Sequence, residues 1–382
     1  MKKGLLIFCF VIFFIACREN YKNDNANEIL IDVDNVIEKL DISSLFEDTI
    51  DIIPLETSSN FLISDIQKIV SKNENIFISD RVNQVIYTFN NSGKYIRSIG
   101  KRGGGPDEYS ELGDFILMGD SVLIQDKFLN KIIIYNNEGE YISTLKLLDL
   151  PYVEFTNIGS KLYFAISYER SELGFYNMIT YDLNTDEYQP HLAYNKETPI
   201  AWGLTNYIYK NREKALFILP RDHNIYEITS NDISAKYHVR FSNNNMSPNS
   251  LKENGEKVLF ESMEKGFITG LNQIVSSPDY LFLSFNEGSS PREVLFNIHE
   301  KENQVCNWFV MDSAGGLYAN KYITTDENEF IIIQDANMFI TAWENIYTGG
   351  TFKDAKVKER FKSLYTHLDE DSNPVIFKFR FK

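Results

Sequence analysis

Basic side chains recur just after short β-prone runs along this 382-residue chain. They are Arg81, Lys127, Arg170, Arg221 and Arg292, together with Arg102 in an adjoining Gly-rich segment. The formal net charge is −16, so a cluster of these bases would invert the local potential and attract an anion. Arginine binds carboxylate, sulfate or phosphate through two parallel hydrogen bonds. We therefore predict that these bases, with His223 beside Arg221, bind an anionic ligand.

An acidic residue lies next to most of these bases. The acids are Asp80, Asp126, Glu169 and Asp222. Exposed ion pairs of this kind contribute only about 0–1 kcal/mol each to stability, and they can brace a loop without binding anything. The sequence therefore leaves two interpretations open, ligand binding and structural pairing.

Motifs for other kinds of chemistry are absent from the sequence. The five histidines show neither H-x-x-x-H nor H-E-x-x-H spacing, and no Gly-x-Ser-x-Gly elbow occurs. The segment Gly103–Pro106 lacks the Gly-Lys-Ser/Thr ending of a phosphate-binding loop, so we interpret it as a tight turn or a contact at the rim of the site. His223 has a second interpretation as a solvated loop residue. We predict no catalytic residues, no metal and no cofactor.

The elements that position the bases come from an internal repeat of 46 residues. Ile76–Ile99 aligns with Val122–Leu145 without a gap. Asp80 then matches Asp126, and each copy contains an Asn-Asn-x-Gly turn. Such turns suit hairpins because Asn and Gly tolerate positive φ. Four short antiparallel strands every 40–50 residues are typical of a propeller blade.

Weaker copies follow, so the sequence predicts an all-β fold, a six-bladed β-propeller of four-stranded antiparallel blades. The sixth blade ends with Pro374–Phe381 and lacks one strand, which we assign to the N-terminal run Ile50–Leu55. That segment would close the ring and hide sheet edges. Two short amphipathic helices, around Phe260–Phe267 and Val357–Leu368, are predicted as insertions that seal gaps between blades or form a lid.

The predicted bases fall on one side of this ring. In a four-stranded meander, the loop between the second and third strands lies on the same side as the connection to the next blade. We call this side the mouth face. The fold prediction thus places the bases around one mouth of the ring.

The N-terminus carries a targeting segment. Lys2 and Lys3 precede 13 apolar residues that end at Ala16, a length that suits a signal peptide and is too short for a mature membrane span. Ala16-Cys17 resembles a bacterial lipobox, in which Cys17 would be acylated; an ordinary secretory signal is the alternative. We predict a signal peptide over 1–16, a lipidated tether over 17–48 and the propeller over 49–382. Loss of residues 1–16 removes two lysines and no acid, so the net charge becomes −18.

The three cysteines support no intramolecular disulfide. Cys9 lies in the predicted signal peptide and Cys17 is the predicted lipid site. Cys306 is then left without a partner, and a metal site built from cysteines is excluded.

Several motifs resemble those of one known family. They are the lipobox Cys17, Ile53–Thr57, Phe77–Asp80, Gly93–Ile96, Gly103–Tyr109 and Asn373–Val375. The sequence resembles the six-bladed β-propeller lipoproteins of Gram-negative bacteria, which are related in form to NHL-repeat and TolB-like propellers. The resemblance implies the fold and a place in the cell envelope, such as the outer membrane. It implies no reaction, and it transfers no catalytic residues.

Three functions are compatible with this fold, since propellers host many activities. The first is a non-enzymatic lipoprotein, held in the membrane by its N-terminal lipid, that binds an anionic glycan, a small molecule or an envelope protein at the mouth. The second is a lyase or hydrolase acting on a glycan or peptide. The third is a scaffold for envelope assembly. The strongly acidic chain argues against nucleic acid as a partner.

Overall fold

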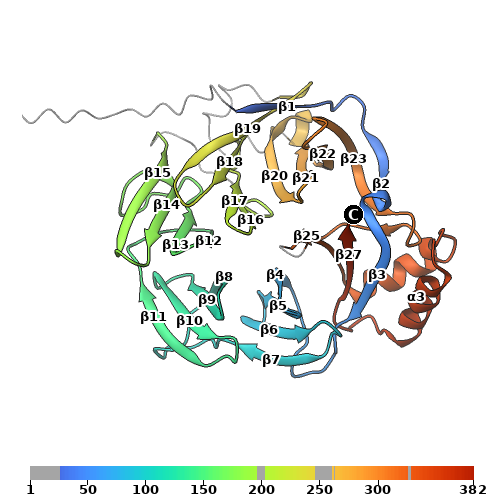
Figure 1. Cartoon of the computed structure of the whole chain (residues 1–382), viewed down its shortest axis with the longest axis horizontal. Coiled ribbons are helices and arrows are strands. Elements are labelled where there is room, and N and C mark those ends of the chain that lie inside the picture. The colour runs from blue at the N-terminus through green and yellow to red at the C-terminus, as the bar shows by residue number, and fades with distance from the viewer. Residues whose placement is uncertain (1–25, 196–202, 246–259, 262, 326–327) are drawn as a thin grey trace, which may run out of the picture.

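The strands of the computed structural model form six sheets arranged in a ring (Figure 1). This statement covers the residues that the structure describes, namely 26–195, 203–245, 260–261, 263–325 and 328–382. Each blade contains four antiparallel strands that follow one another from the inside of the ring outwards. The predicted six-bladed β-propeller is confirmed.

The first three blades are uninterrupted meanders. Blade 1 contains β4 (Ile66–Lys72), β5 (Asn75–Asp80), β6 (Val85–Asn90) and β7 (Tyr95–Ile99). Blade 2 contains β8 (Leu112–Met118), β9 (Ser121–Asp126), β10 (Lys131–Asn136) and β11 (Tyr141–Lys146). Blade 3 contains β12 (Glu154–Ile158), β13 (Lys161–Ala165), β14 (Tyr176–Asp182) and β15 (Glu187–Ala193).

The last three blades take additional or outermost strands from elsewhere in the chain. Blade 4 contains β16 (Ile208–Asn211), β17 (Lys214–Phe217), β18 (Asn224–Ile228) and β19 (Ile233–Phe241). Blade 5 contains β20 (Ile268–Ser276), β21 (Tyr280–Glu287), β22 (Ser290–Asn297) and β23 (Glu302–Met311), and β24 (Leu317–Tyr318) pairs with the end of β23. Blade 6 contains β25 (Tyr322–Thr324), β26 (Glu329–Gln334), β27 (Val375–Phe381) and the N-terminal strand β3 (Phe46–Pro54).

The predicted hairpin turns occur in blades 1 and 2. Gly93 and Gly139 adopt φ of +80° and +83°. A Cβ at Gly93 would lie 2.1 Å from the carbonyl oxygen of Pro54, so a larger residue does not fit there. The Asn90 side chain holds the first turn by accepting backbone hydrogen bonds from Ser92 and Lys94, each at 3.0 Å.

The N-terminal segment adds an outermost strand to three consecutive blades, and we call residues 27–54 the N-terminal belt (blue in Figure 1). β1 (Asn27–Ile31) pairs in parallel with β19, and β2 (Ile37–Asp41) pairs in parallel with β23. A short 3-10 helix, η1 (Ser43–Leu45), leads into β3, which is antiparallel to β27. Closure of the ring by the predicted N-terminal strand is confirmed.

The predicted start of the propeller at residue 49 is wrong. The segment expected to be a tether over 17–48 contains β1 and β2, and the side chains of Ile29 and Ile31 are 1% and 0% exposed. The physical reason is that the outer edges of β19 and β23 carry unpaired backbone groups, which the belt satisfies. Residues 17–25, including the predicted lipid site Cys17, lie outside the described residues, as does the predicted signal peptide.

Polar side chains link the innermost strands of all six blades into a closed ring. In each blade, one side chain at or just before the innermost strand bonds the backbone of the next blade's first strand. The six residues are, in blade order, Gln67, Asp114, Glu154, Asn206, Gln273 and Lys321. Lys321 Nζ donates to the Ile66 carbonyl oxygen at 2.8 Å and so joins blade 6 to blade 1. We call this set the inter-blade ring.

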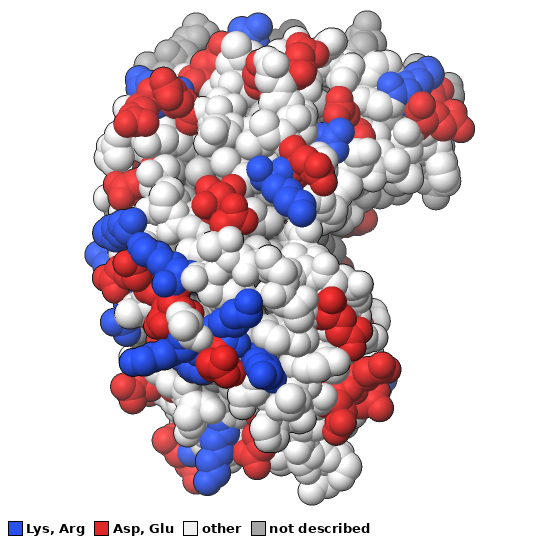
Figure 2. Space-filling view, turned by 90° about the vertical axis from the view of Figure 1, so that its right-hand side faces the viewer, with Lys and Arg blue, Asp and Glu red and all other residues white. Residues whose placement is uncertain are grey.

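Blade 6 carries the helical insertion between β26 and β27. The predicted second helix is confirmed as α3 (Ala355–His367), whose Val357 and Phe361 are buried. Arg360 of α3 donates to the carbonyl oxygens of Ile50 and Ile52, so the helix covers the outer edge of β3. Figure 1 shows α3 on the outer side of β3, and Figure 2 shows that acidic and basic side chains are interspersed on this side of the molecule.

The remaining helices differ from the prediction. The same insertion contains an unpredicted helix, α2 (Ala336–Ala342), which continues as a turn of π-helix, η3 (Trp343–Tyr347). The other predicted helix, around Phe260–Phe267, has helical backbone at the described residues up to Lys265. Phe260 and Met263 are 65% and 47% exposed, so this face does not seal a gap between blades.

Candidate functional site

Arg81 and Lys127 occupy equivalent positions in blades 1 and 2, and each pairs with an acid 16 residues earlier. Arg81 Nε donates to Asp65 Oδ2 at 2.8 Å, and Lys127 Nζ donates to Glu111 Oε1 at 2.9 Å. The two basic side chains stay 69% and 55% exposed. Structural pairing therefore occurs at both positions, although the acids are not the adjacent ones expected from the sequence.

The adjacent acids, Asp80 and Asp126, are buried and bond the backbone instead. The Asp80 carboxylate accepts hydrogen bonds from the backbone N–H of Ser64, at 2.7 Å, and of Val82, at 2.9 Å. Asp126 repeats the first contact with Ser110, at 2.9 Å. Each carboxylate thus ties the connection between blades to the loop between the second and third strands. These acids shape the mouth face and do not pair with Arg81 or Lys127, although Asp126 Oδ2 lies 3.6 Å from Lys131 Nζ.

Arg102 and Arg170 are exposed residues of the mouth face. Arg102 Nε donates to the Ser110 carbonyl oxygen at 3.1 Å. The guanidinium carbon of Arg170 lies 5.8 Å from the centre of the Phe175 ring. Both side chains are therefore placed by contacts with their own or the neighbouring loop.

The Gly-rich loop before blade 2 is organised around an acid. The Glu108 carboxylate accepts a hydrogen bond from Lys101 at 2.6 Å and one from the Gly105 N–H at 2.8 Å. These two bonds lower the pKa of Glu108 below its ordinary value. The glycines thus let a carboxylate approach the backbone, which supports the turn interpretation of this loop.

Arg221 and His223 are partly buried in the connection between β17 and β18. Arg221 adopts a left-handed φ of +60°, and its guanidinium lies 5.9 Å from the centre of the Tyr168 ring. His223 Nδ1 donates to the Val239 carbonyl oxygen at 3.1 Å. Burial lowers the pKa of both side chains, so the His223 imidazole is neutral at pH 7. His223 is packed, and the interpretation as a solvated loop histidine is wrong.

Arg292 was expected in a loop, but it lies within β22. Its guanidinium donates to Glu287 Oε2 at 2.7 Å and to Asn307 Oδ1 at 2.9 Å, and only 19% of the side chain is exposed. The hairpin between β21 and β22 turns at residues 288–289, so the strand starts earlier than predicted. Arg81, Lys127 and Arg292 are thus each neutralised by an acid, which removes the basis for one cationic ring around the mouth.

A buried charged cluster joins the innermost strands of blades 1, 2 and 3, and it was not predicted. Lys68 Nζ lies 2.8 Å from Asp114 Oδ1 and 3.7 Å from Glu154 Oε1. Burial alone would lower the pKa of Lys68, but the two carboxylates outweigh it and raise the pKa. Asp114 Oδ2 accepts from the Phe155 N–H and Glu154 Oε2 from the Tyr207 N–H, so these carboxylates serve the inter-blade ring. Lys68 and Asp114 are separated by 46 residues, the period of the repeat, so they occupy equivalent positions in adjacent blades. This spacing is the sequence signal that could have indicated the pair.

A further acid, Glu293, is partly buried between blades 5 and 6. Tyr322 Oη donates to Glu293 Oε2 at 2.7 Å, and Cys306 is the residue opposite Glu293 in the β22–β23 register. Burial raises the pKa of Glu293 to about 8, although the bond from Tyr322 acts in the opposite direction. Burial also raises the pKa of the free thiol of Cys306 to about 12. At neutral pH this acid is therefore mostly protonated.

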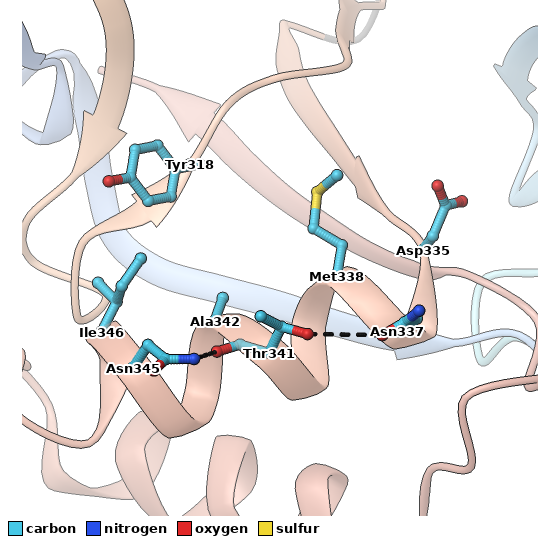
Figure 3. Close-up of a pocket in the computed structure, with 8 residues that line it drawn as sticks. All are labelled: Tyr318, Asp335, Asn337, Met338, Thr341, Ala342, Asn345 and Ile346. Atoms are coloured by element: carbon cyan, nitrogen blue, oxygen red, sulfur yellow. Dashed lines mark hydrogen bonds between the residues drawn. The ribbon is translucent and has the colours of Figure 1, made fainter.

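A groove of about 520 Å³ runs beside α2 and η3 (Figure 3). It starts at Asp335, immediately after β26, and its opposite wall is Tyr318 in the connection between blades 5 and 6. Both segments belong to the mouth face. The predicted face therefore carries a groove, but residues other than the predicted bases line it.

The helical wall of the groove carries two parallel stripes of side chains at intervals of four residues. The apolar stripe is Met338, Ala342 and Ile346, and the polar stripe is Asn337, Thr341 and Asn345. Positions i, i+4 and i+8 lie above one another on a helix. The four-residue spacing of both stripes is visible in the sequence. It gave no prediction of a site, because no helix was predicted over these residues.

The polar stripe is only partly satisfied within the protein. Thr341 Oγ1 donates to Asn337 Oδ1 at 3.4 Å, and Asn345 Nδ2 donates to the Thr341 carbonyl oxygen at 2.8 Å (Figure 3). Among the described residues, no side chain or backbone group bonds Asn337 Nδ2 or Asn345 Oδ1. Because both side chains are exposed, these atoms are available to solvent or to a ligand.

Two side chains pack against Tyr318, which forms the opposite wall. Trp308 is 42% exposed, and its ring meets the Tyr318 ring edge to face at 6.4 Å. Lys39 Nζ lies 5.4 Å from the centre of the Tyr318 ring, and the Tyr318 hydroxyl raises the pKa of Lys39 through a hydrogen bond. A π-helical turn such as η3 is rare and occurs frequently at functional sites. The groove is the candidate functional site.

A family model described as "Domain of unknown function (DUF4934)" matches residues 28–380. The chain belongs to the DUF4934 family. The match includes the N-terminal belt and the helical insertion, so both are part of the DUF4934 domain. No sequence among curated proteins matches the chain.

Two solved structures resemble this DUF4934 protein to different degrees. One is a protein from Bacteroides fragilis described as exported; it is 18% identical with a TM-score of 0.75, and the match covers 93% of this chain and 100% of that one. A second is BamB from Moraxella catarrhalis, which is 10% identical with a TM-score of 0.41 over 71% of this chain and 74% of that one. The first match supports the propeller fold over nearly the whole chain.

Metal-binding groups and membrane-spanning helices are both absent from the described residues. Within them, no group of three or more His, Cys, Asp or Glu side chains could hold a metal ion. No helix in the same residues is long and apolar enough to cross a membrane.

Proposed function

We propose that this DUF4934 protein is an envelope lipoprotein that is anchored through Cys17 and binds a ligand or partner in the groove beside α2, without catalysis. The groove carries the proposal, because its lining combines an apolar stripe, the Tyr318 ring and asparagine amides with free hydrogen-bonding atoms. Ligand sites commonly pair an apolar lining with a few polar groups in this way.

The non-catalytic part of the proposal rests on the state of the buried acids. Asp114 and Glu154 are held by Lys68 and by backbone N–H groups of neighbouring blades. Carboxylates occupied in this way are not available as a general base. A glycan or peptide lyase or hydrolase remains the enzymatic alternative, with Glu293 as the carboxyl that would have to act.

The anchoring part rests on the sequence of residues 1–17. A Cys17→Ala variant of the full chain is expected to leave the membrane fraction or to remain unprocessed, whereas the unaltered chain sediments with membranes. Two lipid signals or chains hold a protein on a bilayer firmly, whereas a single chain binds marginally. Membrane retention of a correctly cleaved Cys17→Ala variant would contradict this part alone.

The binding part is tested by differential scanning fluorimetry of the full Cys17→Ala chain against metabolites and oligosaccharides. A ligand at 100 times its Kd stabilises the native state by about 2.7 kcal/mol. A rise in melting temperature that disappears in an Asn345→Ala variant would place the ligand in the groove. A shift that survives in this variant would contradict the groove as the binding site.

A second candidate function is docking of another envelope protein on the mouth face. The loops between the second and third strands of blades 1 and 2 end in exposed apolar side chains. These are Val82, Phe128 and Leu129, which are 64%, 65% and 55% exposed. Apolar loop tips that recur in adjacent blades are typical of a surface that contacts another protein. A Phe128→Asp, Leu129→Ser variant should then lose a partner that cross-links to the unaltered protein.

A further inference from the structure

The lining of the groove discriminates between charged and uncharged ligands. Of the eight lining residues, only Asp335 carries a charge, and it is negative. Two bases that the structure places beside the groove are already engaged. Lys39 is engaged by the Tyr318 ring and hydroxyl, and Lys321, which interacts electrostatically with Asp335, donates to the Ile66 carbonyl oxygen. An anionic ligand would therefore meet one carboxylate and no free cation, and the groove favours a neutral ligand.

The polar stripe favours hydroxyl groups. An amide side chain presents a carbonyl acceptor and two N–H donors at one site. Asn337 and Asn345 line the groove, and Thr341 bonds both of their side chains, which leaves Asn337 Nδ2 and Asn345 Oδ1 available to a ligand. A hydroxyl group donates and accepts at once, so a row of hydroxyls can satisfy both kinds of group along the stripe.

The aromatic and apolar parts of the lining favour a ligand that also has an apolar face. The ring of Tyr318 forms one wall, and Met338, Ala342 and Ile346 form the apolar stripe on the other. Aromatic rings with a polar edge suit ligands that are apolar on one side and hydrated on the other. The stripes extend over eight residues, which corresponds to about 12 Å of helix. The groove therefore fits an elongated ligand of a few ring units.

We propose that the groove beside α2 binds a short, uncharged oligosaccharide, with the sugar C–H faces on Tyr318 and the apolar stripe and the hydroxyl groups on Asn337 and Asn345. This inference rests on the proposed binding function and specifies its ligand class. An extended peptide fits less well, because peptides commonly add to a free sheet edge. The groove is bounded instead by a helix and by β24, which is already paired with β23.

The test uses the full Cys17→Ala chain and defined oligosaccharides of two to four units. Neutral hexose, N-acetylhexosamine and uronic acid series are titrated by calorimetry. We expect a neutral series to bind and the uronic acid series to bind at least tenfold more weakly. Asn345→Ala should weaken the binding at least tenfold. Asn231→Ala, which removes the same amide from the exposed β18–β19 turn, should leave it unchanged.

A second readout reports the aromatic wall directly. Saccharide binding should change the tryptophan fluorescence of the protein, and a Trp308→Phe variant should lose most of this change while retaining its fold by circular dichroism. Binding without any fluorescence change, or with unchanged affinity in Asn345→Ala, would overturn the placement.

The outcomes separate this inference from the proposed function. If no oligosaccharide binds, or if only the uronic acid series binds and Arg102→Ala abolishes it, the neutral-sugar inference is wrong. A different ligand whose affinity falls in Asn345→Ala would then still support the groove as a binding site. A peptide ligand with that sensitivity would also overturn the carbohydrate class and leave the proposed function standing.

Discussion

Glu293 makes the stability of this protein depend on pH in a specific direction. Burial raises its pKa from 4.5 to about 8 in the folded protein, whereas an unfolded chain would titrate near the ordinary value. Between these two pKa values the folded state binds one more proton than the unfolded state. Stability therefore falls as pH rises from about 4.5 to 8, and this group adds no slope outside the window. The whole effect amounts to about 5 kcal/mol, because each pKa unit corresponds to about 1.4 kcal/mol.

A Glu293→Gln substitution isolates this effect. The amide oxygen can still accept the hydrogen bond from Tyr322, and the amide does not ionise. The variant should match the unaltered protein near pH 4.5 and exceed its stability increasingly up to pH 8. The free energy of unfolding is measured by urea denaturation at half-unit intervals between these limits. Glu302→Gln, which removes an exposed carboxylate from the same blade, is the matched control.

Two results would refute this reasoning. One is an identical pH dependence in the Glu293→Gln variant and the unaltered protein. The other is a variant that is less stable than the unaltered protein at pH 8, since the ionised Glu293 would then be the form that the fold stabilises.

Three further outcomes follow from the structure. Deleting residues 27–41 should lower stability by about 6 kcal/mol and cause aggregation, because Ile29, Ile31 and Leu40 are buried and each contributes about 2 kcal/mol. Equal melting temperatures of this variant and a control lacking 18–25 would contradict it. Lys68→Met should cost about 3 kcal/mol because it leaves buried carboxylates unpaired, whereas Lys72→Met, in the same strand, should cost little in urea denaturation. Cys306 should resist a thiol reagent in the native protein and react on unfolding, since burial raises its pKa to about 12; rapid native labelling would contradict its burial.

The repeating part of the fold could be predicted because its determinants are local. The Asn-Asn-x-Gly turns and the 46-residue spacing specify hairpins within one blade, and Gly93 and Gly139 adopt the expected positive φ. The closing strand was found by counting, since blade 6 lacked one strand. α3 was recognised because Val357 and Phe361 lie four residues apart on one helical face.

The first two strands of the N-terminal belt, β1 and β2, could not be predicted because their determinants are distant. β1 and β2 are five residues each, and most of their side chains are exposed. Their stability depends on backbone pairing with β19 and β23 rather than on an apolar pattern of their own. A polar composition before residue 49 therefore looked like a tether, although it belongs to edge strands.

The candidate site was mispredicted for a related reason. The bases of the mouth face are visible in the sequence, but their partners Asp65 and Glu111 lie 16 residues away, in the preceding connection. The acids adjacent to these bases in the sequence, Asp80 and Asp126, were the expected partners, but they bond the backbone. The groove could not be predicted, because its polar and apolar stripes lie on one short helix. Neither stripe by itself indicates a binding surface in the sequence.

The N-terminal belt has a consequence for the order in which the chain folds. Val33 bonds Ser242, 209 positions away, and Asn373 bonds Thr57, 316 positions away. The first strands to leave the ribosome therefore have no partners until the last blades exist. Contacts of such long sequence separation form late and slowly. Blades 1 to 3, which pair through local hairpins, can form before the belt docks, and the pairing of β1 and β2 with blades 4 and 5 completes the outer edges of the ring late in folding.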